Sequence, residues 1–206
     1  MKNLNKDQLR LDLNYIARII ENNSRVLDLG CGSGELLHKL AQEKNIRGHG
    51  VEIDVENICA CVEKGVPVIH ADMDEGLGEY PDKSFDYVIL SQTLQAVKKP
   101  HIILHDMLRV GQTGIVSLLN FGYWKVRSQL FVQGIMPRTK TLPYQWYDTP
   151  NIHLTTIKDF KNLCAEGNIT IKQQINLGQA RKGGVLYNLF PNWFTSLAIF
   201  VIKKNK

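Results

Sequence analysis

Three glycines within five residues constrain the fold of this chain more than any other feature of its sequence. The segment Asp28-Leu-Gly-Cys-Gly-Ser-Gly34 directly follows an apolar run over 25–30 and directly precedes a helical pattern over 35–41. Glycine lets the backbone turn tightly and lets a ligand approach the main chain. The free N–H groups of a helix N-terminus attract a carboxylate. The loop therefore predicts a strand–turn–helix unit that can hold a small ligand.

Apolar runs and helical patterns alternate along the chain beyond this loop. Strands are expected over 25–30, 48–54, 66–71, 85–90, 114–119, 169–175 and 195–202. Helices are expected around the apolar positions Leu9, Leu13, Ile16 and Ile20, over 35–41, from an Asp54 cap to Gly65, over 100–110, and from a Thr156/Asp159 capping box through Cys164. Alternation predicts an α/β fold, a doubly wound Rossmann-like sheet, and the last two strands fit a C-terminal antiparallel pair.

The length of 206 residues predicts a single domain over 1–206. A segment at about 120–153 breaks the alternation and is too long for a simple loop, so we expect an insertion. It can close over a substrate, form an interface, or pack as ordinary core. Its basic residues, Lys125, Arg127, Arg138 and Lys140, favour an interface or an anionic ligand.

Charge is distributed unevenly along the chain. Residues 1–110 hold 13 basic and 17 acidic side chains (−4), whereas residues 111–206 hold 12 and 3 (+9), which together give the net charge of +5. The basic half suggests an anionic partner. No apolar run is long enough for a transmembrane helix, the N-terminus is too polar for a signal peptide, and the four cysteines lack zinc spacing. We therefore expect a cytoplasmic protein with reduced thiols and no metal site.

The glycine loop does not fit the common nucleotide-binding patterns. Glu35 stands where a dinucleotide fingerprint needs its last glycine, and the Lys-Ser/Thr of a P-loop is missing. The pattern acid-x-Gly-x-Gly-x-Gly instead resembles motif I of class I S-adenosylmethionine-dependent methyltransferases. The resemblance implies a site for S-adenosylmethionine or S-adenosylhomocysteine that includes Asp28, Gly30, Gly32 and Gly34.

Further residues at strand ends match the same methyltransferase pattern. Glu52, at the end of the second strand, corresponds to the acid that binds both ribose hydroxyls, whereas nearby Asp54 suits a helix cap better. Asp72 matches the acid that binds the adenine amino group, and Met73 offers a backbone N–H and an apolar surface to the ring. Gln92 follows the fourth strand and is expected to line the cleft, although ordinary loop polarity explains it equally well.

Several segments together resemble a narrower family, the methionine-biosynthesis protein MetW family. They are VLDLGCGSGELL (26–37), FDYVILSQTLQ (85–95), MLRVGQTGIVS (107–117), NFGYWKVR (120–127) and GIMPRTKTLPYQWYDTPNIHLTTIKDF (134–160). The resemblance implies a seven-stranded methyltransferase sheet and a role in methionine biosynthesis. It also implies a protein partner, a homoserine O-acyltransferase that this chain supports or activates.

Methyl transfer itself is a separate hypothesis. His153 is the candidate catalytic base, with a structural hydrogen bond to the backbone as its alternative role. The Asn/Asp-Pro-Pro-Tyr/Phe motif of nucleic-acid amino methyltransferases is absent after the fourth strand, where the sequence is Leu90-Ser-Gln-Thr-Leu-Gln95. Three hypotheses follow, in order of preference: an accessory protein of methionine biosynthesis, an active small-molecule methyltransferase, and a nucleic-acid binder using the basic half.

Overall fold

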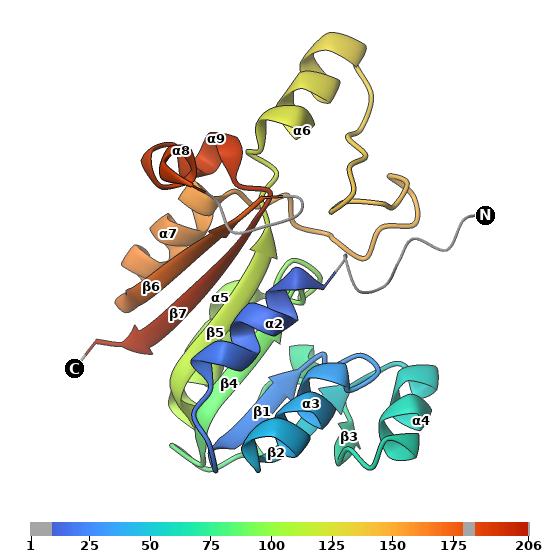
Figure 1. Ribbon diagram of the computed structural model, residues 1–206, viewed down its shortest axis with the longest axis vertical. Coiled ribbons are helices and arrows are strands. Elements are labelled where there is room, and N and C mark those ends of the chain that lie inside the picture. The colour runs from blue at the N-terminus through green and yellow to red at the C-terminus, as the bar shows by residue number, and fades with distance from the viewer. Residues whose placement is uncertain (1–9, 179–183, 206) are drawn as a thin grey trace.

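The computed structural model describes residues 10–178 and 184–205 of the chain. In that part, seven strands form one sheet in the order β3-β2-β1-β4-β5-β7-β6 (Figure 1). The strands are β1 (Arg25–Leu29), β2 (Arg47–Glu52), β3 (Val68–His70), β4 (Phe85–Ser91), β5 (Gly111–Leu119), β6 (Ile169–Leu177) and β7 (Leu197–Lys204). The first five run parallel, and β7 lies antiparallel between β5 and β6. The predicted doubly wound sheet with a C-terminal antiparallel pair is confirmed.

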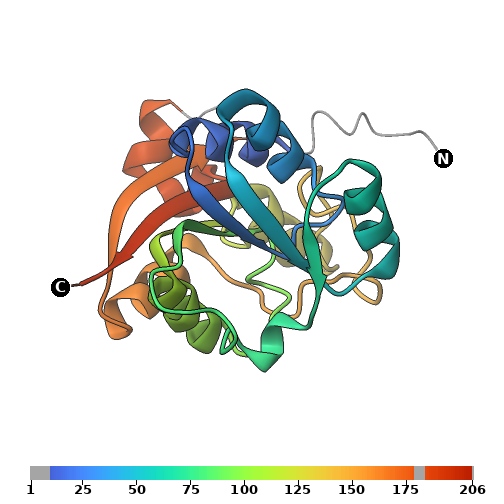
Figure 2. The same cartoon turned by 90° about the horizontal axis from the view of Figure 1, so that it is seen from below.

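Helices cover both faces of the sheet. They are α2 (Leu11–Ile19), α3 (Glu35–Lys44), α4 (Val55–Glu63), α5 (Pro100–Val110), α6 (Trp124–Ser128), α7 (Ile157–Glu166), α8 (Val185–Leu189) and α9 (Pro191–Phe194), with a 3₁₀ turn η1 (Met73–Glu75) and a π-helical turn η2 (Gln129–Gln133). Helices α2 and α3 lie on one side of the sheet, and α5 lies on the other (Figure 2).

Side chains of the central strands alternate between two buried clusters. Ile89 and Ile115 pack with α2 and α3, whereas their neighbours Leu90 and Val116 pack with α5 and α7. This alternation follows from the two-residue period of a strand. Because both faces of the inner strands are covered, those strands are apolar almost throughout.

The predicted boundaries hold to within a few residues. The Asp54 side chain accepts from the Asn57 N–H and caps α4, and the capping box of Thr156 and Asp159 opens α7. Strand β3 is shorter than expected, because Pro67 has no N–H to donate to a ladder. Strand β5 begins three residues earlier than predicted, and β7 is shifted two residues toward the C-terminus. Leu9, part of the predicted N-terminal helix, lies outside the described residues.

Candidate functional site

The predicted site residues gather at the carboxyl ends of the parallel strands. The glycine loop follows β1, Glu52 ends β2 and Gln92 follows β4. Strand β1 lies between β2 and β4, so the chain leaves β1 at the point where the order of strands reverses. In open α/β sheets ligands bind in the crevice at this switch point.

The three loop glycines all have positive φ, yet they differ in what surrounds them. Their φ angles are 70° at Gly30, 54° at Gly32 and 72° at Gly34. A Cβ on Gly30 would lie 2.6 Å from Thr93 Cγ2, and one on Gly34 would lie 2.9 Å from Cys61 Sγ. A Cβ on Gly32 would meet no described atom within 4 Å. Gly30 and Gly34 are therefore fixed by packing as well as by conformation, whereas the space beside the Gly32 Cα, where a Cβ would lie, is open.

Glu52 ties the glycine loop to the end of β2. Its carboxylate is buried, and Oε2 accepts from the Gly32 N–H at 2.8 Å. Oε1 accepts from the N–H groups of Ile53 at 2.9 Å and Asp54 at 3.0 Å. Since a carboxylate offers about four acceptor positions, these three bonds leave Glu52 with room for one more donor.

Asp28, the predicted site acid on β1, is buried beside the glycine loop. Its side chain is 2% exposed, and Oδ1 has no hydrogen-bond partner among the described residues. Burial raises the pKa of Asp28 from 3.8 to about 7; Arg10 partly opposes this rise, whereas Glu52 and Asp12 add to it. A buried carboxyl group with an unused acceptor is costly unless a donor or a cation completes it.

Helix α2 contributes two site residues that the sequence analysis missed. Asp12 is fully buried, and its Oδ2 accepts from Ser91 Oγ at 2.9 Å, Ser117 Oγ at 3.0 Å and Gln92 Nε2 at 3.0 Å. Arg10 Nε lies 3.6 Å from Asp12 Oδ1. Asp12 lies four residues before the buried Ile16, on the apolar face of the helix. An acid on that face was the sequence feature that could have revealed it.

The Gln92 side chain is held by the protein rather than free in the cleft. Besides its bond to Asp12, Gln92 adopts a φ of 60°, which is uncommon for a residue with a side chain. Its backbone N–H donates to the carbonyl oxygen of Ser117 at 3.0 Å. Gln92 therefore links α2, β4 and β5 at the edge of the site.

Asp72 and Met73 follow β3, where the methyltransferase pattern requires them. Asp72 caps η1 by accepting from the Asp74 N–H at 2.9 Å. Met73 begins that turn, and its Cε lies 3.2 Å from the position a Cβ would take on Gly30. The structure thus brings Met73 against the glycine loop, with Asp72 as its direct neighbour.

His153 lies beside Gln95, in the segment that follows β4. Its backbone N–H donates to the Gln95 carbonyl oxygen at 3.0 Å, and its Nε2 is buried without a partner in the described part of the chain. Gln95 is itself buried and pairs with both backbone groups of Leu119. The backbone of His153 thus makes a structural hydrogen bond, and its imidazole also keeps an unused nitrogen. Neither of the two expected roles is removed by the other. No cluster of three or more potential metal-ligating side chains occurs among residues 10–178 and 184–205.

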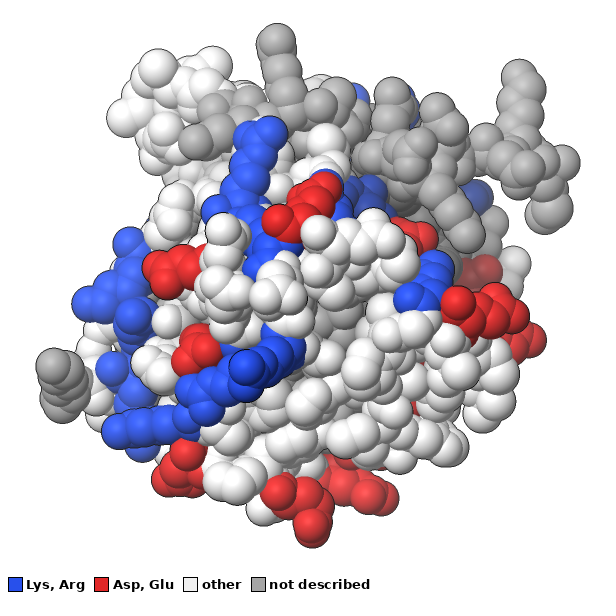
Figure 3. Space-filling model, turned by 60° about the horizontal axis from the view of Figure 1, so that its bottom comes forward, with Lys and Arg blue, Asp and Glu red and all other residues white. Residues whose placement is uncertain are grey.

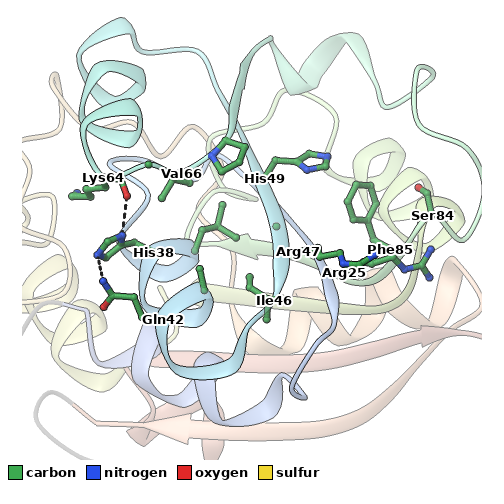
Figure 4. Close-up of a pocket in the computed structure, with 15 residues that line it drawn as sticks. Arg25, His38, Gln42, Ile46, Arg47, His49, Lys64, Val66, Ser84 and Phe85 are labelled. Atoms are coloured by element: carbon green, nitrogen blue, oxygen red, sulfur yellow. Dashed lines mark hydrogen bonds between the residues drawn. The ribbon is translucent and has the colours of Figure 1, made fainter.

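A large cavity lies at the amino ends of the strands and is not part of this site. It measures about 760 Å³, and its lining includes the first residues of β1, β2 and β4, namely Arg25, Arg47 and Phe85 (Figure 4). Its polar groups are largely engaged: Arg25 pairs with Asp86 at 2.8 Å, and His38 bonds the Lys64 carbonyl oxygen at 3.0 Å. Strand β3 pairs with β2 only from Gly50 onward, so the start of β2 has β1 as a strand neighbour on one side and this hollow near its other side.

The surface charge does not form one continuous basic face on the side drawn in Figure 3. There, Lys and Arg of the described residues form separate groups interrupted by uncharged surface and by Asp and Glu. Non-specific nucleic-acid binding relies on many phosphate contacts to basic side chains, and this face offers no such track. In the described part of the chain, no helix combines the length and apolarity needed to cross a bilayer.

The family of the chain follows from comparison with known proteins. A family model described as "Methionine biosynthesis protein MetW" matches residues 10–202. The chain belongs to the MetW family. A curated relative, the "Bifunctional methionine biosynthesis protein MetXA/MetW" of Rhodopirellula baltica, is 37% identical over 176 residues, which cover 81% of this chain and 28% of the relative. This MetW-family chain therefore spans less than a third of that relative's length.

Solved structures support the methyltransferase fold. A SAM-dependent methyltransferase from Archaeoglobus fulgidus superposes with a TM-score of 0.67 at 18% identity, covering 97% of this chain and 95% of that one. Another from Thermotoga maritima gives a TM-score of 0.67 at 16% identity, covering 95% and 88%. At this identity the likeness establishes the fold alone, and this MetW-family chain has the fold of class I methyltransferases.

Proposed function

We propose that the chain binds S-adenosylmethionine or S-adenosylhomocysteine at the carboxyl ends of β1, β2, β3 and β4. The observation that carries this proposal is the unpartnered Oδ1 of buried Asp28, next to a glycine loop with open space beside Gly32. An α-ammonium group is the kind of donor that would complete Asp28, because a charge-assisted hydrogen bond favours the ionised carboxylate. The donor set therefore fits the amino-acid end of such a ligand.

The other site residues would contact the ribose and the adenine of the ligand, as the methyltransferase resemblance implies. Glu52, already ordered by three backbone N–H groups, would accept from one ribose hydroxyl through its remaining acceptor position. Asp72 and Met73 would bind the adenine. When bound, S-adenosylmethionine supplies an electrophilic methyl group on a sulfonium; the chain's own residues bind and orient it.

We further propose that the chain acts in methionine biosynthesis by supporting or activating a homoserine O-acyltransferase. The MetW-family membership and the relative that carries MetXA and MetW in one polypeptide support this association. Two functions joined in one chain in one organism commonly correspond to subunits that meet in another. We expect the chain to act in the cytoplasm.

Two measurements test the proposal. Titration calorimetry with S-adenosylmethionine and S-adenosylhomocysteine should show binding that is lost when Glu52 is replaced by Ala. Acyl transfer by the purified acyltransferase should rise when the chain is added, and co-purification should recover both proteins. The same assay with and without S-adenosylmethionine shows whether the ligand regulates the acyltransferase. Absence of ligand binding, or of any effect on acyl transfer, contradicts the respective half of the proposal.

A second candidate function is methyl transfer to a small molecule. The buried, unpartnered Nε2 of His153 favours it, because an unused imidazole nitrogen can accept a proton from an acceptor substrate. The test is production of S-adenosylhomocysteine with candidate acceptors such as homoserine and its acyl esters. Turnover that falls in a His153→Gln variant with an unchanged melting temperature supports this function. Tight ligand binding without turnover supports the accessory role instead.

A further inference from the structure

One element of the structure projects from the body of the molecule. It comprises α6, η2 and the returning segment 134–142, and is called the arm below. In Figure 1 α6 stands above the rest of the chain, beyond the end of β5. At its base, Tyr123, Val126 and Leu142 are buried in the same apolar cluster as α2 and α3. The arm is therefore anchored to the core at both of its ends.

The arm has a fixed conformation with its own hydrogen bonds. Gln129 Nε2 donates to the Arg138 carbonyl oxygen at 3.0 Å, and the Arg138 N–H donates back to Gln129 Oε1 at 2.8 Å. The N–H groups of Thr139 and Leu142 each donate to the carbonyl oxygen of the other, at 3.0 and 3.2 Å. Arg127 holds the base by donating to the Gly122 carbonyl oxygen and stacking on Trp193 at 4.7 Å. The Gln129–Arg138 pair therefore ties η2 to the returning segment, and Arg127 ties α6 to the base of the arm.

The tip of this ordered arm is apolar and faces solvent. Phe131 is 91% exposed and Val132 is 76% exposed. Their large apolar neighbours are also exposed, namely Leu130, Ile135 and Met136. An aromatic side chain carries about 150–250 Å² of surface, so these five residues leave several hundred Å² of apolar surface open, as much as the largest patches on typical monomers. The hydrogen bonds of the arm keep these side chains directed toward solvent. The arm is therefore suited to insert them into the surface of another molecule.

A hollow beside the arm extends the patch. It measures about 220 Å³ and is lined by residues of the arm and of the segment that follows, including Met136, Leu142, Tyr144 and Trp146. Trp146 and Tyr147 are themselves mostly exposed. Trp and Tyr are enriched among the side chains that dominate protein–protein binding energy. The arm thus offers both a projecting knob and a neighbouring pocket.

The charge around the patch indicates the chemistry of the occupant. Residues 120–153 contain four basic side chains and a single acidic one, Asp148, which gives a net charge of +3. A second copy of this chain would bring two such basic segments together, and like charges across an interface are unfavourable. A partner with an apolar groove and an acidic rim would complement both the side chains and the charge.

We propose that the arm is the docking element for the homoserine O-acyltransferase, with Phe131 and Val132 inserted in an apolar, acid-rimmed groove of that enzyme. This inference rests on the proposed function, since it names the surface through which that partnership is made. The relative that carries MetXA and MetW in one chain supports the choice of partner over a membrane or a second copy.

The test compares two matched substitutions in the full chain. Val132→Asp alters the arm tip, and Val62→Asp places the same charge on α4, where the valine is 66% exposed. Figure 1 shows α4 far from α6. Binding of each variant and of the wild type to the purified acyltransferase is measured by titration calorimetry. We expect Val132→Asp to weaken binding at least about 30-fold, as removal of a hot-spot side chain does, and Val62→Asp to leave it within about 2-fold. Equal melting temperatures show that both variants fold.

The outcomes distinguish failure of the arm proposal from failure of the proposed partnership with the acyltransferase. If the wild type binds the acyltransferase and Val132→Asp binds equally well, the arm is not the docking element, although the proposed function survives. If both variants lose binding, the effect is one of charge and the arm proposal fails. If the wild type binds no acyltransferase, the proposed partnership fails and takes the arm's role with it. A last outcome also overturns the proposal. The wild type binds phosphatidylserine vesicles or itself, Val132→Asp does not, and both bind the acyltransferase equally well. The arm is then a membrane-binding or dimerisation element.

Discussion

Replacing Asp28 by Asn isolates the energetic consequence of burying an unpartnered carboxyl group. In the folded chain burial raises the pKa of Asp28 from 3.8 to about 7. Between pH 4 and pH 7 the native carboxyl group therefore holds a proton that the unfolded chain has released, so stability falls as the pH rises through this range. Since a pKa difference of one corresponds to about 1.4 kcal/mol, the carboxylate costs the fold about 4 kcal/mol above pH 7 as an upper limit. The neutral amide of Asn avoids this cost.

The assay is urea unfolding of wild type and Asp28→Asn at pH 5 and pH 8. The free energy of unfolding of the variant, relative to wild type, should be higher at pH 8 than at pH 5 by about 2–4 kcal/mol. Asp86→Asn is the matched control, because its hydrogen bond to Arg25 lowers the pKa of Asp86. That substitution removes a favourable interaction of the ionised form, so it should destabilise the chain more at pH 5–8 than at pH 3. A relative stability of Asp28→Asn that does not change between pH 5 and pH 8 refutes the argument.

Further substitutions separate the parts of the site. Asp12→Ala should destabilise the fold by about 3 kcal/mol, measured by urea unfolding, because it leaves three side-chain donors without their acceptor. Glu52→Gln should lower the affinity for S-adenosylhomocysteine at least about 10-fold in calorimetry, because an amide cannot accept from all the groups that the carboxylate holds. Gly32→Ala should cost about 1–2 kcal/mol of backbone strain and abolish ligand binding in the same assay, since its Cβ points into open space. Gly30→Ala should destabilise the fold further, because its Cβ would clash with Thr93.

Most of the fold could be predicted because its strands are long, apolar and separated by clear helical patterns. The parallel sheet follows from the alternation alone, and the caps at Asp54 and Thr156 follow from residue type and spacing. The strand limits were less certain. Strand β7, for example, begins at Leu197, because Thr195 donates its backbone N–H to the Pro191 carbonyl oxygen and ends α9 just before the strand. Such local hydrogen bonds leave no trace in an apolar pattern.

The candidate site divides between residues that a motif fixes and residues that only the fold brings in. Asp28 and Glu52 could be predicted because each lies at or next to the end of a strand beside the glycine loop. Asp12 could not be connected to Ser91 and Ser117, because 79 and 105 residues separate it from them along the chain. Their meeting depends on how α2 packs across β4 and β5. Gln92 was expected in the cleft, but its role in tying α2 to the sheet also required the structure.

The arm shows where an apolar pattern stops being informative. Phe131 and Val132 belong to a segment whose composition resembles a helix packed on a core, and the sequence left ordinary packing open as one interpretation of 120–153. The apolar composition of a segment indicates that its side chains favour burial. It does not indicate whether the same chain or another chain buries them. The structure supplies the missing fact, because Val126 and Leu142 are buried in the core whereas the tip between them is open. Apolar residues that the chain's own fold leaves uncovered, on an element fixed by its own hydrogen bonds, require a cover from outside the described chain. The basic side chains around them then narrow that cover to a surface with acidic character.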